Sequence, residues 1–277
     1  MNPTVLITGA STGLGRTAAG LFARSGWNVA ATMRRAEDGA ALAALPNVLV
    51  TRLDVQDPQS IGSAIEAALA RFGRIDALVN NAGYGLFGIF EGTPPEKVRE
   101  QFDVNVFGLM DTIRAILPHF RANKRGLIIN VSSGAGVFTL PMLSLYCASK
   151  FALEGFSESL SYELSSQNIT VKVVEPGGVV TTNFGKRSGA EAAANQPLAD
   201  YDRFVAGANE IFAGLRDSRK ATEEDVARVI LEAATDGSDR LRYVATADIL
   251  PLVTARRETS EVDYMALMRA TFLPKAK

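Results

Sequence analysis

The chain is 277 residues long and 47% hydrophobic, and its 29 basic and 30 acidic residues leave a net charge of -1. This balance predicts neither a nucleic-acid-binding nor a membrane-binding surface, and no apolar run reaches the roughly 20 residues of a membrane helix. The chain has a single cysteine, Cys147, which excludes an internal disulfide. It also has a single histidine, and one cysteine with one histidine cannot form a standard zinc site, so we expect no metal. Without a secretory signal pattern, we expect a cytoplasmic protein.

Short β-branched runs alternate along the chain with longer segments of helical period. Apolar strands without polar alternation are typical of parallel sheets that are buried on both faces. Strands are expected at Val5–Thr8, Asn28–Met33, Val48–Leu53, Ala77–Asn80, Leu127–Ser132, Val171–Glu175 and Leu241–Val244, and helices at Gln59–Phe72, Glu96–Phe120, Ala148–Ser166 and Glu223–Ala234. The alternation predicts an α/β fold, with residues 1–277 forming a single-domain, doubly wound parallel sheet of Rossmann-like type that has helices on both faces.

A glycine cluster follows the first expected strand and opens a helix. Its sequence is Gly9-Ala10-Ser11-Thr12-Gly13-Leu14-Gly15. Glycines let the backbone approach a phosphate closely, and the start of a helix offers unpaired N–H groups and positive dipole charge. The spacing differs from the common dinucleotide fingerprint. A tight strand–helix turn would have the same composition, but the position after the first strand favours dinucleotide binding.

The end of the second expected strand bears on the choice of cofactor. NAD-binding sheets usually place an acidic residue there for the ribose 2′-hydroxyl, whereas this chain has Met33 followed by Arg34 and Arg35. A guanidinium suits a 2′-phosphate, so we expect NADP(H) to be favoured over NAD(H). The alternative is that both arginines are solvated residues at the start of a helix.

Tyr146 and Lys150 lie one helical turn apart on one face of an expected helix. A tyrosine ionises near pH 10, and a nearby ammonium would lower its pKa by roughly 1–3 units. Such a phenol becomes a usable acid and base for an alcohol–carbonyl pair. Ser132 and Ser133 end the fifth expected strand, where a hydroxyl is placed to stabilise charge on a substrate oxygen. A surface pair and ordinary turn serines are the alternatives.

The stretch 184–219 has the weakest pattern in the chain. An insertion after a strand's carboxyl end lies over the ligand crevice of a doubly wound sheet, so we expect a substrate lid, with a plain surface loop as the alternative. Apolar residues expected to line a hydrophobic substrate pocket, or else to pack the lid onto the core, are Tyr84, Leu86, Phe87, Val137–Leu143, Phe184, Tyr201, Phe204, Val205, Ile211 and Phe212.

Taken together, these motifs resemble the short-chain dehydrogenase/reductase family along nearly the whole chain. The matching residues, in order, are Thr8-Gly9, Gly13, Gly15, Asp54-Val55, Asn80-Asn81-Ala82-Gly83, Asn105, Ser133, Tyr146, Lys150 and Pro176-Gly177-Gly178-Val179-Val180-Thr181. The separation of Ser133 and Tyr146 is also the family's usual one. The stretch 256–277 has no counterpart that we can interpret.

The resemblance implies a cofactor site. Thr8–Gly15, which includes Ser11, Thr12 and Leu14, would hold the pyrophosphate, and Asp54 the adenine amino group, with Val55 beside the ring. Asn81, followed by Ala82 and Gly83, would fix the fourth strand against the cofactor. Pro176, Gly177, Val179 and Thr181 would line the nicotinamide.

The resemblance also implies a catalytic set: Asn105, Ser133, Tyr146 and Lys150. Tyr146 would be the general acid and base, and Ser133 would orient the substrate oxygen. Lys150 would bind the nicotinamide ribose, and Asn105 would hold a water that links the lysine to solvent.

We expect a carbonyl reductase that uses NADP(H) and a hydrophobic ketone, aldehyde or secondary alcohol, and that forms a homodimer or homotetramer, since members of the family commonly pair through two long helices. Two alternatives are an NAD-linked alcohol dehydrogenase and a non-catalytic dinucleotide sensor; the intact catalytic set disfavours the sensor.

Overall fold

The computed structural model describes residues 2–179, 188, 192, 195–218 and 220–274. Its centre is a seven-stranded sheet of order β3-β2-β1-β4-β5-β6-β7, in which every neighbouring pair is parallel. The strands are β1 (Thr4–Ile7), β2 (Asn28–Met33), β3 (Val48–Arg52), β4 (Ala77–Asn80), β5 (Gly126–Val131), β6 (Ile169–Glu175) and β7 (Arg242–Val244). Each lies within a residue or two of its predicted range, so the doubly wound α/β fold is confirmed.

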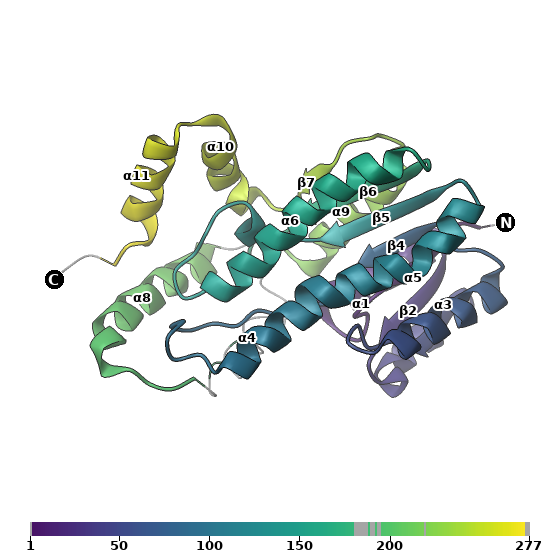
Figure 1. Ribbon diagram of the computed structural model, residues 1–277, viewed down its shortest axis with the longest axis horizontal. Coiled ribbons are helices and arrows are strands. Elements are labelled where there is room, and N and C mark those ends of the chain that lie inside the picture. The colour runs from purple at the N-terminus through teal and green to yellow at the C-terminus, as the bar shows by residue number, and fades with distance from the viewer. Residues whose placement is uncertain (1, 180–187, 189–191, 193–194, 219, 275–277) are drawn as a thin grey trace.

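Helices cover both faces of the sheet (Figure 1). They are α1 (Gly13–Arg24), α2 (Ala40–Ala43), α3 (Pro58–Phe72), α4 (Pro95–Phe102), α5 (Gly108–Ala122), α6 (Ser144–Ser165), α8 (Asp202–Ser218), α9 (Glu223–Thr235), α10 (Leu250–Glu258) and α11 (Glu261–Phe272). Local chemistry sets the ends of α3: the Asp57 carboxylate accepts hydrogen bonds from the backbone N–H groups of Gln59 and Ser60, and Gly73 ends the helix at a φ of 80°. No described helix is long and apolar enough to cross a membrane.

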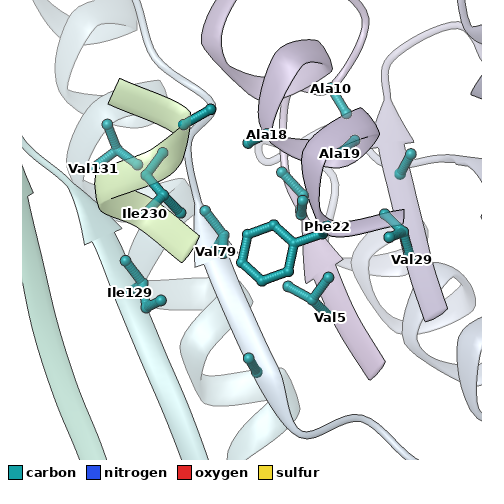
Figure 2. Packing of buried hydrophobic residues seen from close by; sticks show 14 of the residues in the cluster. Val5, Ala10, Ala18, Ala19, Phe22, Val29, Val79, Ile129, Val131 and Ile230 are labelled. Carbon is teal, nitrogen blue, oxygen red and sulfur yellow. The ribbon is translucent and has the colours of Figure 1, made fainter. Parts of the chain in front are cut away.

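Successive residues of each strand point to opposite faces, which produces two separate hydrophobic cores. Val5 and Ile7 of β1 pack with α1 and α9, whereas Leu6 between them packs with α3, α5 and α6 on the other face. Figure 2 shows the first core, where Phe22 of α1 and Ile230 of α9 lie over the strands. This burial on both faces explains the continuous apolar strands of the sequence.

The helix predicted at Glu96–Phe120 is interrupted in the structure. Between α4 and α5, residues Asp103–Phe107 form a π-helical turn. The wider turn adds one residue to the helical circuit, which changes the face on which each following side chain lies. Asn105 lies on this turn and is 1% exposed, so the interruption directs its amide into the protein.

The C-terminal helices α10 and α11 pack on the end of the sheet around Phe138, which shares a hydrophobic cluster with Val253 and Met268. This packing accounts for the described part, up to residue 274, of the stretch that the sequence left without an interpretation.

A buried ion network lies beneath the C-terminal helices. Arg257 of α10 pairs with Glu175, the fully buried last residue of β6. Arg242 of β7 donates from Nε to Glu154 of α6 at 2.9 Å, also pairs with Glu158, and lies 3.7 Å from Glu175. Burial and the nearby Glu154 charge raise the pKa of Glu175, which the two arginines oppose. The network joins α6, β6, β7 and α10.

Candidate functional site

The carboxyl ends of the strands open into one cavity of about 890 Å³. Its wall has two parts, which we name by their construction. The loop limb is made by the segments that follow β1 to β4, and it contains Gly9, Ser11, Thr12, Gly13, Leu14, Arg34, Asp54, Val55, Asn81, Ala82 and Gly83. The helix limb contains Phe138, Leu140, Leu143, Phe212, Leu252 and Phe272. Ser133, Tyr146 and Lys150 also line this cavity, as do Pro176, Gly177 and Val179.

The glycines of the loop limb are required by its geometry. Gly9 and Gly13 have φ angles of 68° and 58°, in the left-handed region that other residues rarely adopt. A Cβ on Gly9 would lie 2.9 Å from the Cα of Ala82. Gly15 does not line the cavity: a Cβ there would overlap the Gly9 carbonyl and the Asn81 amide, so this glycine allows close packing of α1.

Asn81 fastens the end of β4 to the glycine loop. Its Nδ2 donates to the backbone carbonyls of Thr8 at 3.0 Å and Gly9 at 3.1 Å. In return, the Thr8 hydroxyl accepts from the backbone N–H groups of Asn81 and Ala82, both at 3.0 Å. These four bonds hold the loop in its tight conformation before any ligand contributes.

At the end of β2, Met33 is buried, and the two arginines that follow it are exposed. Met33 is 1% exposed, and Arg34 is exposed at the wall of the cavity. The Arg35 guanidinium binds both carboxylate oxygens of Asp38, at 3.0 and 3.1 Å. Asp38 is thus paired with Arg35, and the exposed guanidinium of Arg34 lines this corner of the cavity.

Tyr146 and Lys150 lie together on α6, as their spacing predicted. The lysine Nζ lies 5.8 Å from the centroid of the tyrosine ring and donates to the Val131 carbonyl at 2.9 Å. The Ser133 hydroxyl hydrogen-bonds the Tyr146 side chain and also accepts from the Ala135 N–H at 3.1 Å. The end of β5 and the first turns of α6 thus bring serine, tyrosine and lysine to one point.

The pKa of the tyrosine departs from the sequence-based expectation. Burial raises the pKa of Tyr146 to about 12, and the hydrogen bond from Ser133 only partly opposes this. Burial likewise lowers the pKa of Lys150 to about 8, against the nearby Glu154 charge. The shift is therefore opposite to the expected lowering, because the cost of removing the phenolate from water outweighs the hydrogen bond from Ser133.

Asn105 lies behind the cavity wall instead of lining it. Its Oδ1 accepts from the Tyr84 N–H at 3.1 Å, while Nδ2 donates to the Tyr84 carbonyl at 2.8 Å and to the Ser149 hydroxyl at 3.1 Å. A Cβ on Gly83 would come within 3.1 Å of Asn105 Oδ1 and 3.9 Å of Lys150 Nζ. Glycine at this position therefore leaves space next to both side chains. Asn105 braces the strand-end segment next to the lysine.

The segment after β6 rests on the chain that precedes α10. The Gly177 N–H donates to the Thr246 hydroxyl at 2.9 Å, and the Gly178 N–H donates to Asp248 at 3.0 Å. A side chain on Gly177 would collide with both partners. Val180 and Thr181 lie outside the described residues.

The cavity contains only part of the predicted apolar set. Tyr84, Phe87, Phe138, Leu140, Leu143 and Phe212 line it, and Phe184 lies outside the described residues. Predicted residues that do not line it are Leu86, Val137, Thr139, Pro141, Met142, Tyr201, Phe204, Val205 and Ile211. Sequence reasoning missed Leu215, Leu252 and Phe272, and with them the polar Asn209 and Arg216. Only the helical period of α8 could have linked Asn209 and Arg216 to Phe212.

Comparison with known proteins identifies the class. A family profile described as short chain dehydrogenase matches residues 3–192. An uncharacterized oxidoreductase of Schizosaccharomyces pombe is 38% identical over 86% of this chain and 98% of its own. Bovine (Bos taurus) retinol dehydrogenase 8 is 34% identical over 91% and 84%, and the 17-beta-hydroxysteroid dehydrogenase type 1 of Mus musculus is 35% identical over 97% and 81%. The chain belongs to the short-chain dehydrogenase family and is an oxidoreductase.

Solved structures agree with this assignment. A short-chain dehydrogenase from Streptomyces avermitilis has a TM-score of 0.81 at 31% identity, covering 98% of this chain and 96% of its own. A Burkholderia phymatum member in complex with NAD has a TM-score of 0.80 at 25% identity, covering 100% and 97%. ElxO with NADP bound has a TM-score of 0.71 at 25% identity, covering 88% and 98%. The cofactor of this chain is a nicotinamide dinucleotide.

Proposed function

We propose that this protein is a carbonyl reductase in which Tyr146 is the general acid and base, with the whole chain acting as one dinucleotide-binding domain. The observation that carries the proposal is the meeting of Ser133, Tyr146 and Lys150 in the same cavity as the glycine loop. Nucleophilic and metal-dependent chemistry lack comparable groups there: Cys147 is buried, and the described residues contain no cluster of metal-binding side chains.

The loop limb fits a dinucleotide. Gly9 and Gly13 leave space for a phosphate at the start of α1, where Thr12 occupies the N-cap position without a side-chain capping bond. Asp54 and Val55 are placed for the adenine, and Pro176 to Val179 for the nicotinamide, with Thr181 assigned there from the family motif. The cofactor, when bound, supplies the hydride for the carbonyl carbon or accepts it from the alcohol.

Residues of the protein donate the proton to the substrate oxygen and hydrogen-bond that oxygen. In the reductive direction the Tyr146 hydroxyl gives its proton to the substrate oxygen, while Ser133 hydrogen-bonds the same oxygen as charge develops on it. The high pKa of Tyr146 keeps this proton in place at neutral pH. The Lys150 ammonium lies 5.8 Å from the centre of the Tyr146 ring and would bind the ribose. Asn105 holds the backbone of Tyr84 next to this lysine.

NADP(H) is the preferred cofactor in this proposal. At the end of β2 the residue in the usual acidic position is the buried Met33, and the exposed Arg34 faces the cavity. A 2′-phosphate would meet a guanidinium there and no carboxylate, because Asp38 is bound by Arg35.

The substrate is a ketone, aldehyde or secondary alcohol with a bulky apolar body. Phe138, Leu143, Phe212 and Phe272 give the helix limb an apolar wall next to Tyr146. Burying apolar substrate surface against such a wall contributes about 25 cal/mol per Å² to binding. A sugar would lose its hydrogen bonds to water there and regain few from the wall. Retinol dehydrogenase and hydroxysteroid dehydrogenase among the relatives fit this class by name.

We further propose a cytoplasmic homodimer or homotetramer. Three aromatic side chains, one on the turn between α4 and α5 and two on α6, are exposed: Phe107 by 54%, Phe151 by 38% and Tyr162 by 70%. Exposed aromatic groups of this kind are typical of protein interfaces. Light scattering of the purified protein measures the assembly.

A carbonyl panel assayed with NADPH and NADH tests the proposal. We expect oxidation of NADPH with aryl, terpenoid or steroid ketones, at a higher kcat/KM than with sugars or short keto acids. Tight NADPH binding without turnover of any carbonyl or alcohol would favour the sensor alternative. Equal use of NADH would overturn the cofactor preference and leave the reaction class standing.

A further inference from the structure

Helix α8 presents one stripe of side chains to the cavity. Asn209, Phe212 and Arg216 follow one another at helical spacing, and all three line the cavity wall. Phe212 belongs to the hydrophobic cluster that contains Tyr146, and its ring meets Phe87 edge to face at 5.2 Å. The stripe therefore has an apolar centre beside the reacting tyrosine and a polar residue on either side.

Arg216 differs from the other basic residues that line the cavity. Lys150 is buried and bonded to the Val131 carbonyl, and Arg34 lies at the end of β2 in the loop limb. Arg216 comes from α8, which lies at the other end of the molecule from β2 and α3 (Figure 1). Within the described part of the chain, Arg216 makes no ion pair with a carboxylate.

We infer that Arg216 selects substrates that combine an apolar body with a distant carboxylate, so that the preferred ligands are oxo-carboxylic acids with the two groups several carbons apart. This inference rests on the proposed function and names a substrate class within it. Arg216 lies one turn beyond Phe212, and a turn of helix advances about 5.4 Å. A guanidinium fork binds a carboxylate in two parallel hydrogen bonds, which a neutral ester cannot match.

The spacing separates this class from short keto acids. A carboxylate next to the reacting carbonyl would lie beside Tyr146 and Phe212, where Leu143 and Phe212 make the wall apolar and the Lys150 ammonium is already bonded to the Val131 carbonyl. In a substrate with a longer alkyl chain, the apolar segment contacts Phe212 while the carboxylate at its end reaches Arg216. The carboxylate is then held at the exposed part of the helix, where it keeps contact with water.

The test uses ω-benzoyl alkanoates of increasing chain length, each paired with its methyl ester. With the preferred cofactor, we expect kcat/KM to favour the acid over its ester by about tenfold at the best length, as for a charge-assisted contact. Arg216→Gln should bring this ratio to about one, with the larger loss in the kcat/KM of the acid. Arg203→Gln, the same change on the same helix outside the cavity wall, should preserve the ratio.

Several outcomes overturn the inference. They are a wild-type ratio near one at every length, an unchanged ratio in Arg216→Gln, an equal loss for acid and ester, and a raised KM for the cofactor alone. If neither compound is turned over, the proposed function fails, and calorimetric titration of the pair into the Tyr146→Phe protein with cofactor still decides whether Arg216 distinguishes acid from ester.

Discussion

The loop limb and the helix limb of the cavity are built by different means. In the loop limb, backbone and short side chains form the wall: Gly9 and Gly13 have positive φ angles, and Asn81 is bonded to the main chain of Thr8. In the helix limb, large side chains of α8, α10, α11 and the segment between β5 and α6 form the wall. The first construction admits few residue types at each position, and the second admits many.

This difference explains why the loop limb is recognisable from the sequence and the helix limb is not. A loop that must approach a phosphate requires glycine at fixed positions, so its sequence is recognisable. A helix that presents Phe212 or Leu252 to a cavity requires only an apolar residue of suitable volume, and other residues would serve a different ligand. Variants that affect one limb and spare the other test this division.

The largest effect is expected from Tyr146→Phe, at the junction of the limbs. The change removes the proton donor and keeps the ring, so we expect kcat to fall by about 10²–10⁴ while the dissociation constant of the cofactor stays within a factor of about two. Steady-state kinetics and a fluorescence titration with NADPH measure the two quantities. Substantial remaining turnover would assign the acid–base role to another group.

The pH dependence follows from the raised pKa of Tyr146. A pKa near 12 means that the phenol is protonated throughout the neutral range, which is the form that reduction needs. Oxidation needs the deprotonated form, whose fraction grows about tenfold per pH unit below the pKa. We therefore expect kcat/KM for reduction to stay flat from pH 5 to 7, where Lys150 keeps its charge, and kcat/KM for oxidation to rise by about 10² over the same range. An oxidation plateau below pH 8 would show that the ternary complex lowers this pKa.

Arg34→Ala should affect the loop limb alone. A charge-assisted contact with a phosphate contributes about 1.5–3 kcal/mol, or one to two decades in affinity. We expect the dissociation constant of NADPH to rise by about that factor and that of NADH to stay unchanged. Arg35→Ala is the matched control, since Arg35 is paired with Asp38. Equal losses for both cofactors in Arg34→Ala would contradict the phosphate assignment.

Leu252→Ala should affect the helix limb alone. Leu252 is half-buried at the cavity wall, and its truncation removes apolar contact of about 1 kcal/mol. We expect kcat/KM for an aryl ketone to fall by about fivefold, with no change in cofactor affinity. Leu250→Ala, on the same helix but outside the cavity wall and 50% exposed, serves as control. A comparable fall in the control would place the effect in the packing of α10.

The smallest effect is expected from Cys147→Ser. Cys147 follows Tyr146 in sequence, but it is 3% exposed and belongs to a hydrophobic cluster with Leu143 and Phe212. Placing a hydroxyl there should lower stability by about 1 kcal/mol and change kcat/KM by less than a factor of about two. Thermal unfolding and steady-state kinetics are the measurements, and a large loss of kcat at unchanged stability would assign the thiol a chemical role.

The sequence predicted the sheet and the meeting of Tyr146 and Lys150 because each leaves a local pattern. Strands buried on both faces are continuously apolar, and a pair such as Tyr146 and Lys150 is fixed by the period of one helix. The interruption of the predicted helix at Asp103–Phe107 was missed, since a π turn changes the hydrogen bonding and not the composition.

The remaining features depend on contacts between distant segments. The direction of the Tyr146 pKa shift follows from how deeply the assembled fold buries the ring, which spacing along α6 does not determine. Phe272 reaches the cavity only because α11 folds back over Phe138. No local pattern links residues so far apart in the chain.

Through the ion network beneath the C-terminal helices, the stability of the sheet depends on the last part of the chain. Glu175 is fully buried one residue before the segment that lines the cavity, and Arg257 of α10 is one of its two cationic neighbours. A protein shortened before α10 would leave this carboxylate with Arg242 alone, which also pairs with Glu154 and Glu158. Because Arg257 is 35% exposed and Arg242 stays near Glu175, we expect the loss of Arg257 to cost less than the about 3–5 kcal/mol of a fully buried pair. Grafting a new substrate-binding C-terminus onto this scaffold therefore requires keeping a cation at position 257.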